Sequence, residues 1–168
     1  MALDIYDISI PVLIRGLTNL AGIIDKAAAH AEAKKIDPLV LAQSRLYPDM
    51  LPFTRQIQIA CDISKGCAAR LAGIEIPKHE DNEVNLADLK QRVAKTLDFL
   101  RSVPAAKLAG AESRAIEIKS PTRTLNFTGL GYLTGFVLPN LYFHETVAYA
   151  LLRHNGVELG KADFLGSL

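Results

Sequence analysis

The residues best suited to chemistry lie in one apolar segment near the end of the sequence, PNLYFHETVAYALLRHNGVELGK, from Pro139 to Lys161. Within it, His144 precedes Ala148 and Leu151 at helical spacing, which places its imidazole on or beside the face that should meet the core. Two interpretations are open: a core histidine bonded to a nearby acceptor, or a metal ligand or general base. Because Asn140 and Ala148 occupy the positions four residues away, a second histidine ligand on this helix is missing.

Four polar side chains share the neighbouring face of the same helix, spaced by three or four residues: Tyr142, Glu145, Tyr149 and Arg153. A phenol, a carboxylate and a guanidinium together could bind a small anionic or polar ligand. They could equally form a hydrogen-bonded seam against another helix or another subunit. His154 stands at the helix end, where the dipole favours a partly charged imidazole, so we expect it to cap the helix.

Two other features suggest chemistry that their spacing argues against. In GVELGK the two glycines follow a helix instead of opening one, and Ala162 replaces the Ser or Thr of a phosphate loop, so nucleotide binding there is excluded. Cys61 and Cys67 lie on different faces of one predicted helix, so we expect buried, reduced thiols rather than a disulfide or a zinc site.

These residues need elements that position them, and the hydrophobic pattern predicts four long helices. Apolar residues recur at helical spacing over about 4–35, 52–73, 85–103 and 139–155. Asp37 and Pro38 predict a short helix, and residues 115–127 alternate around the turn SPTR, which predicts a small β-hairpin before the last helix. In the helix at 52–73, Gln58, Lys65 and Ala69 lie opposite the apolar stripe and are expected to face solvent. In the last helix Phe143, Val147, Ala150 and Leu151 are expected to point inward.

The predicted fold is therefore all-α: a four-helix bundle, residues 1–168 as one domain, decorated by the hairpin. A simple up-and-down order would make the helices at 52–73 and 139–155 parallel. Their starts would then lie together, and His144 would be close to Tyr47, Asp49 and Gln56 in a polar pocket.

Bulk composition excludes several classes of partner. The 19 Lys and Arg against 18 Asp and Glu give a net charge of +1, which offers no electrostatic surface for nucleic acid or an anionic membrane. The first residues, MALDIYDISIPVLIRGL, carry acids before the apolar run and match neither a signal peptide nor a membrane span. We expect a cytoplasmic protein.

Several longer stretches carry a family resemblance: RLYPDMLPFTRQI, ARLAGIEIP, TLDFLRSV and PNLYFHETVAYALLRHNGVELGKADFLG. They resemble a bacterial and fungal family of unknown function in the DinB/YfiT-like metalloenzyme superfamily, over nearly the whole chain. The resemblance implies a DinB-like four-helix bundle in the mirror variant of the up-and-down topology, commonly a homodimer.

The resemblance also implies a kind of site. DinB-like metalloproteins typically hold a divalent metal with one histidine from the second long helix and two histidines, four apart, on the last. This sequence keeps His144 of these, with Ala148 at the partner position and Gln56 or Asp49 on the second helix.

Two functions remain open. One is a DinB-like protein with a polar pocket for a small molecule, and the other is a metal-dependent, thiol-linked transferase using Zn²⁺ or Ni²⁺ at His144. The candidate pocket residues are Tyr47, Asp49, Gln56, Tyr142, His144, Glu145, Tyr149 and Arg153.

Overall fold

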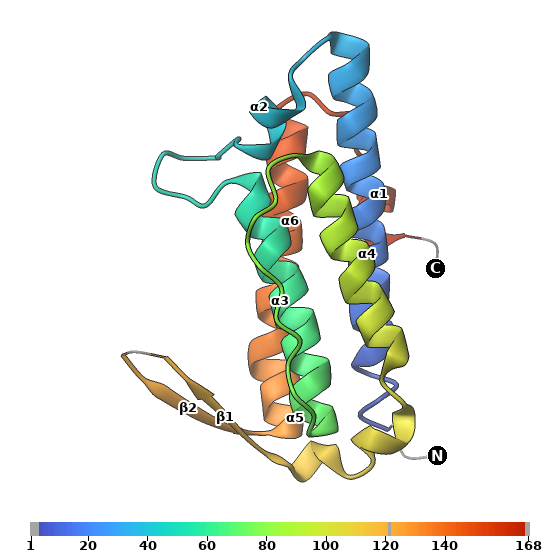
Figure 1. The fold of residues 1–168 in the computed structure, drawn as a ribbon, viewed down its shortest axis with the longest axis vertical. Coiled ribbons are helices and arrows are strands. Elements are labelled where there is room, and N and C mark those ends of the chain that lie inside the picture. The colour runs from blue at the N-terminus through green and yellow to red at the C-terminus, as the bar shows by residue number, and fades with distance from the viewer. Residues whose placement is uncertain (1–3, 121, 167–168) are drawn as a thin grey trace.

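The computed structural model describes residues 4–120 and 122–166, and four long helices dominate it (Figure 1). They are α1 (Ile10–Lys34), α3 (Phe53–Ala72), α4 (Leu86–Ser102) and α6 (Leu138–His154). Helix α4 packs between α1 and α3, and α6 packs against α3 and α1. The all-α fold with a hairpin before the last long helix is confirmed.

Local sequence signals set most helix boundaries. Short helix α2 (Pro38–Ala42) begins with Asp37, whose side chain accepts from the Leu39 N–H at 2.9 Å. Asn85 and Asp88 form a reciprocal capping box at the start of α4. Gly73 ends α3 at φ +65°, a conformation that glycine adopts without strain. The first long helix starts later than expected, because residues 4–9 form turns.

The order of helix directions differs from the simple up-and-down prediction. In Figure 1, α1 and α6 run upward and α3 and α4 both run downward. Parallel neighbours need a long connection, and residues 74–85 provide it by returning along the whole of α3. Helix α3 has 20 residues and is ~30 Å long, a distance that about 12 extended residues can span.

This returning loop explains why α3 is buried on more sides than predicted. Gln58, Lys65 and Ala69 were expected to face solvent, yet they are 2%, 5% and 0% exposed. Gln58 Nε2 donates to Glu83 Oε2 at 2.8 Å, which fixes the loop over the outer face of the helix. A helix covered on both faces lies at the centre of the fold.

The last long helix begins earlier than the predicted start at residue 139. The helical backbone is continuous from α5 (Gly129–Tyr132) through a π-helical segment (Leu133–Val137) into α6. Pro139 lacks the N–H that would bond one turn back, and the wider π turn lets the helix continue past it. His144 therefore lies well inside this helix, which is antiparallel to α3 and not parallel as expected.

The remaining elements are short. Two 3₁₀ turns (Ala105–Leu108 and Ala111–Ser113) lead to strands β1 (Ala115–Lys119) and β2 (Thr124–Thr128), paired from Ala115↔Thr128 to Lys119↔Thr124. Pro121 of the expected turn lies outside the described residues. Helix α7 (Lys161–Leu165) packs against α1. Among the described helices, none is long and apolar enough to cross a membrane.

Candidate functional site

His144 projects from α6 toward the start of α3 and is 8% exposed. Its Nδ1 lies 2.7 Å from Gln56 Oε1. Gln56 is itself fixed, because its Nε2 donates to the Leu51 carbonyl at 2.9 Å. The structure thus brings together two of the candidate residues, His144 and Gln56, although the helices run in opposite directions.

This chain of hydrogen bonds determines which nitrogen of His144 carries the proton. The Gln56 amide nitrogen is used by Leu51, so only the amide oxygen faces the imidazole, and Nδ1 must donate. Burial lowers the pKa of His144, which favours the neutral ring at pH 7. Nε2 then presents a lone pair, and it has no hydrogen-bond partner among the described residues.

The surroundings of His144 differ from the predicted pocket. Phe143 was expected to point inward but is 56% exposed, with its ring edge-on to the imidazole at 5.1 Å between centroids. Val147 and Leu151 are buried as predicted and Ala150 is half-buried, but His144 and not Phe143 takes the inward position one turn before Val147. Tyr47 is 65% exposed and Asp49 is also exposed, and no hydrogen bond joins either side chain to His144.

Glu145 lies about 100° further around the helix and faces α1 instead of α3. It is 5% exposed, and its Oε1 is fully buried with no hydrogen-bond partner among the described residues. Burial raises the pKa of this carboxyl to about 7, an effect that the Arg15 charge partly offsets. A Cβ at Gly16 would overlap Oε1, so the carboxyl fits only because position 16 is glycine.

A cavity of about 310 Å³ opens beside Glu145, between α1, α6 and α7. Arg15, Gly16 and Asn19 line it from α1, Tyr142 and Thr146 from α6, and Phe164 from α7. Tyr149 packs edge-on against Phe164, with ring centroids 6.2 Å apart, and Arg153 is exposed. The predicted polar face of the last helix is therefore divided: Tyr142 and Glu145 line a cavity, Tyr149 supports its wall, and Arg153 is outside it.

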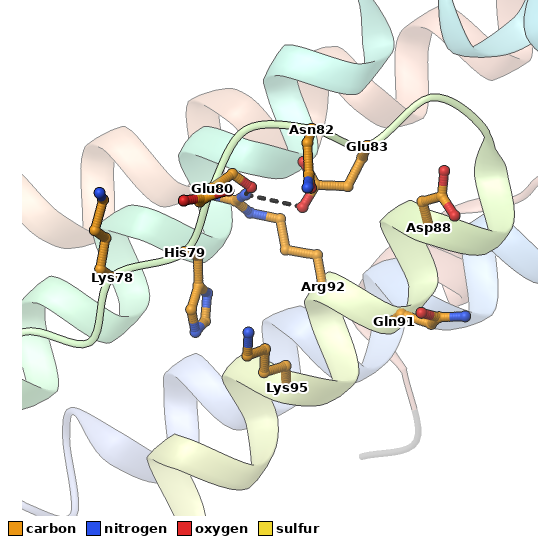
Figure 2. A pocket seen from close by; sticks show the side chains of 9 residues that line it. All are labelled: Lys78, His79, Glu80, Asn82, Glu83, Asp88, Gln91, Arg92 and Lys95. Carbon is orange, nitrogen blue, oxygen red and sulfur yellow. Dashed lines mark hydrogen bonds and ion pairs between the residues drawn. The ribbon is translucent and has the colours of Figure 1, made fainter.

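A second polar region centres on Arg92 of α4, whose side chain is 1% exposed (Figure 2). Its guanidinium pairs with Asp62 of α3 at 2.8 Å, with Asp81 at 3.0 Å and with Glu83 at 2.9 Å, and it donates to the Glu80 carbonyl at 3.0 Å. Burial alone would lower the pKa of Arg92, but the hydrogen bond to Glu83 and the charges of Asp62 and Glu83 raise it. These contacts tie the returning loop to both helices.

A cavity of about 480 Å³ lies beside this cluster. In Figure 2, Lys78, His79 and Lys95 lie on one side of it and Glu83 and Asp88 on the other. Its charges are of both signs. Burial and the nearby Lys65 and Lys95 lower the pKa of His79, which favours a neutral ring. Because Arg92 is already bonded to three carboxylates, we interpret this region as the attachment of the loop.

The family model described as "Domain of unknown function (DUF1993)" matches residues 5–165. The chain belongs to the DUF1993 family. A solved relative is a DinB family member protein from Shewanella denitrificans, determined at 1.83 Å resolution. It is 45% identical, the match covers 97% of this chain and 92% of that one, and the TM-score is 0.89. Among curated proteins, none matches.

For this DUF1993 chain, the metal expected from the DinB resemblance can be tested against the donor atoms. In the described ranges, no group of three or more His, Cys, Asp or Glu side chains is placed to hold a metal ion. The nearest partner of His144 is an amide, Gln56, and its oxygen already accepts from the imidazole. Cys61 and Cys67 are buried, free thiols, and burial raises the pKa of each to about 12. These residues do not fit a three-histidine centre.

Sequence reasoning missed Arg15, Gly16 and Asn19 as partners of the last helix, and Arg92 as the centre of an ion-pair cluster. An isolated glycine in a strongly helical pattern, such as Gly16, is a usable signal for close approach by another group. For Arg92 the signal is the acidic stretch HEDNE just before its helix, which offers more carboxylates than a plain linker needs.

Proposed function

We propose that this DUF1993 protein binds a small molecule bearing a hydroxyl or thiol group, which donates a hydrogen bond to Nε2 of His144. The observation that carries the proposal is the bond from His144 Nδ1 to Gln56 Oε1. It holds the imidazole in one tautomer with the acceptor nitrogen unoccupied by any described residue.

The geometry supports this role because Nδ1 is satisfied by Gln56, which leaves Nε2 as the acceptor of the ring. A buried imidazole whose Nδ1 proton is held by a fixed acceptor is preorganised to accept a proton or hydrogen bond at Nε2. The lowered pKa of His144 keeps that lone pair available at neutral pH. Exposed Leu51 and Phe143, at 43% and 56%, offer apolar contacts next to it.

A thermal-shift screen of small thiols and alcohols, with wild type and His144→Phe side by side, tests this proposal. A ligand at about 100 times its Kd should stabilise wild type by about 2.7 kcal/mol. The variant should lose that stabilisation while remaining folded, since phenylalanine fills the same space. Equal shifts for both proteins would place binding away from His144.

A second candidate is a divalent-metal site, with Zn²⁺ or Ni²⁺, that uses His144 Nε2. The bond to Gln56 favours it, because metal-bound histidines usually donate their other ring N–H to a fixed acceptor. Elemental mass spectrometry on untagged protein separates the two candidates. Near-stoichiometric metal that disappears in His144→Ala supports the metal site, and a metal content unchanged by this substitution rules that site out.

A further inference from the structure

We propose that the cavity between α1, α6 and α7 is a separate binding site for a small primary amine with an apolar body, whose ammonium group pairs with the Glu145 carboxylate. This cavity lies on the α1 side of α6, whereas His144 faces α3. The two sites therefore use adjacent residues of one helix on different faces.

The first support is the carboxyl group itself. Glu145 is 5% exposed, and its Oε1 is fully buried without a partner in the described part of the chain. A buried carboxylate without a donor is costly, and proteins rarely retain one unless something else supplies the hydrogen bonds. Gly16 leaves the space that Oε1 occupies, so the backbone of α1 is shaped around this group.

The second support is that two residues with oxygen acceptors, Glu145 and Asn19, line the cavity together with the donor groups of Arg15, Tyr142 and Thr146. Asn19 Nδ2 is already used, because it donates to the Phe164 carbonyl at 3.0 Å and holds α7 in place. Its Oδ1 accepts no hydrogen bond from the described residues. A carboxylate and an amide oxygen together match the N–H groups of an ammonium and would repel an anion.

The third support is the wall that would contact the rest of the ligand. Val12, Phe164 and Leu165 are apolar, and the Tyr142 ring lies at the same cavity. The volume of about 310 Å³ is at the lower end for small-molecule sites, which suits a compact amine. Aromatic rings near a cation add further attraction.

Arg15 is the rival partner for Glu145, since it lines the same cavity and is the other charged residue among the described lining groups. It is exposed, and it forms no ion pair within the residues that the structure describes. If its guanidinium occupied the cavity in solution, amines would compete with it and Arg15→Gln would strengthen their binding. Our assignment instead predicts little change in that variant.

The test is calorimetric titration with butylamine, hexylamine and 2-phenylethylamine, each compared with the alcohol of the same skeleton, of the full chain carrying His144→Phe, so that an alcohol bound at His144 does not contribute. We expect the best amine to bind at millimolar or lower concentration and its alcohol at least about tenfold more weakly. Glu145→Gln should abolish the preference for the amine. Glu158→Gln removes an exposed carboxylate and serves as the matched control, with no change expected.

Gly16→Ala supplies a second, independent variant, because its Cβ displaces the carboxyl without removing it. Amine binding should weaken in this protein too. The proposal is overturned if no amine of the panel binds, if amine and alcohol bind alike, or if Glu145→Gln retains the preference. Binding that becomes about tenfold or more stronger in Arg15→Gln, beyond the modest effect of losing a nearby positive charge, would instead identify Arg15 as the native partner.

Discussion

Arg92 and Glu145 are two buried charged side chains of this protein, 3% and 5% exposed, and they are treated in opposite ways. Arg92 is surrounded by partners: three carboxylates and a carbonyl take up its guanidinium. Glu145 has an oxygen that no described residue contacts with a hydrogen bond, beside a cavity. The charge of Arg92 is compensated by three carboxylates of the chain, although its Nε is also buried without a hydrogen-bond partner among the described residues, whereas the Glu145 carboxyl forms no ion pair there.

The difference indicates what each region is for. A compensated buried charge fixes geometry, and here it attaches the returning loop to α3 and α4. A buried charge without a partner lowers the stability of the folded state. Proteins retain such charges mainly where a ligand or a reaction needs them. On this argument the Arg92 cluster belongs to the scaffold and Glu145 to a binding site.

The largest effect should come from Arg92→Met, which leaves Glu83 without a cation and removes one of the two cations from Asp62 and from Asp81, which keep Lys65 and Arg55. We expect the free energy of unfolding to fall by about 3–5 kcal/mol, as for other broken buried pairs. Urea denaturation measures it. Arg101→Met is the control, because its pair with Asp98 has side chains 56% and 80% exposed, and it should change little. Equal losses in both variants would contradict a scaffold role for Arg92.

Gly16→Ala should destabilise the protein by about 1–3 kcal/mol, because the new Cβ overlaps Glu145 Oε1. Gly22→Ala is the matched control on the same helix. Its Cβ would meet nothing within 4 Å, so the free energy of unfolding should rise by about 0.5–1 kcal/mol. Combining Gly16→Ala with Glu145→Ala should remove most of the loss. Additive effects would show that the carboxyl is not what Gly16 accommodates.

Gln56→Met should cost about 1–2 kcal/mol, since the Nδ1–H of His144 and the Leu51 carbonyl both lose a partner. Nitrogen-15 NMR of the imidazole should show one tautomer in wild type and a mixture in the variant. Gln43→Met, at an exposed position, is the control. A tautomer mixture already present in wild type would remove the basis of the proposed function.

The smallest effect belongs to the exposed pair Lys90–Asp25, at 2.5 Å with side chains 51% and 54% exposed. Lys90→Gln should cost at most about 0.5 kcal/mol at low ionic strength, and the difference should vanish in high salt. Chemical denaturation with and without added sodium chloride measures it. A larger, salt-resistant loss would mean that surface charges matter as much as the Arg92 cluster.

The helices and the hairpin could be predicted because their signals are local. Asp37, Asn85 and Gly73 mark helix ends through hydrogen bonds and backbone angles within a few residues. The direction of α4 could not be predicted, because residues 74–85 carry no periodic pattern that shows a return along α3. That error also led to the wrong solvent-facing side for α3.

The candidate site shows the same limit. Gln56 and His144 are in contact although α6 was predicted to run parallel to α3. The last helix also begins earlier than predicted, and this second error offsets the error in direction. Tyr47 and Asp49 were assigned to the pocket only from that topology, and they lie in an exposed loop. The contact of Gly16 with Glu145 joins residues far apart in the sequence, and no local pattern specifies it.

The central claim is that Glu145 is a buried, unpaired carboxyl, and its effect on stability against pH tests this most directly. Its pKa is raised from 4.5 to about 7, so the folded state holds the proton more tightly than the unfolded chain. The protonated Glu145 therefore stabilises the folded state fully below about pH 4.5. This stabilisation, roughly 3 kcal/mol in total, is lost as pH rises to about 7 and above.

The residues around Glu145 allow its effect on stability to be measured in this pH range. On α1 the charged residue at the cavity is Arg15, and the described residues of α7 that line it, Phe164 and Leu165, do not titrate. His144, whose pKa burial lowers, faces α3 and is present in both proteins to be compared, so its effect cancels in the difference.

The measurement is the free energy of unfolding of wild type and Glu145→Gln, determined by urea denaturation from pH 4.5 to pH 8. We predict that the free energy of unfolding of the variant increases relative to that of wild type as pH rises, and that the variant is the more stable protein at pH 8. A constant difference between the two proteins across this range, or a variant that is less stable at pH 8, would contradict the account.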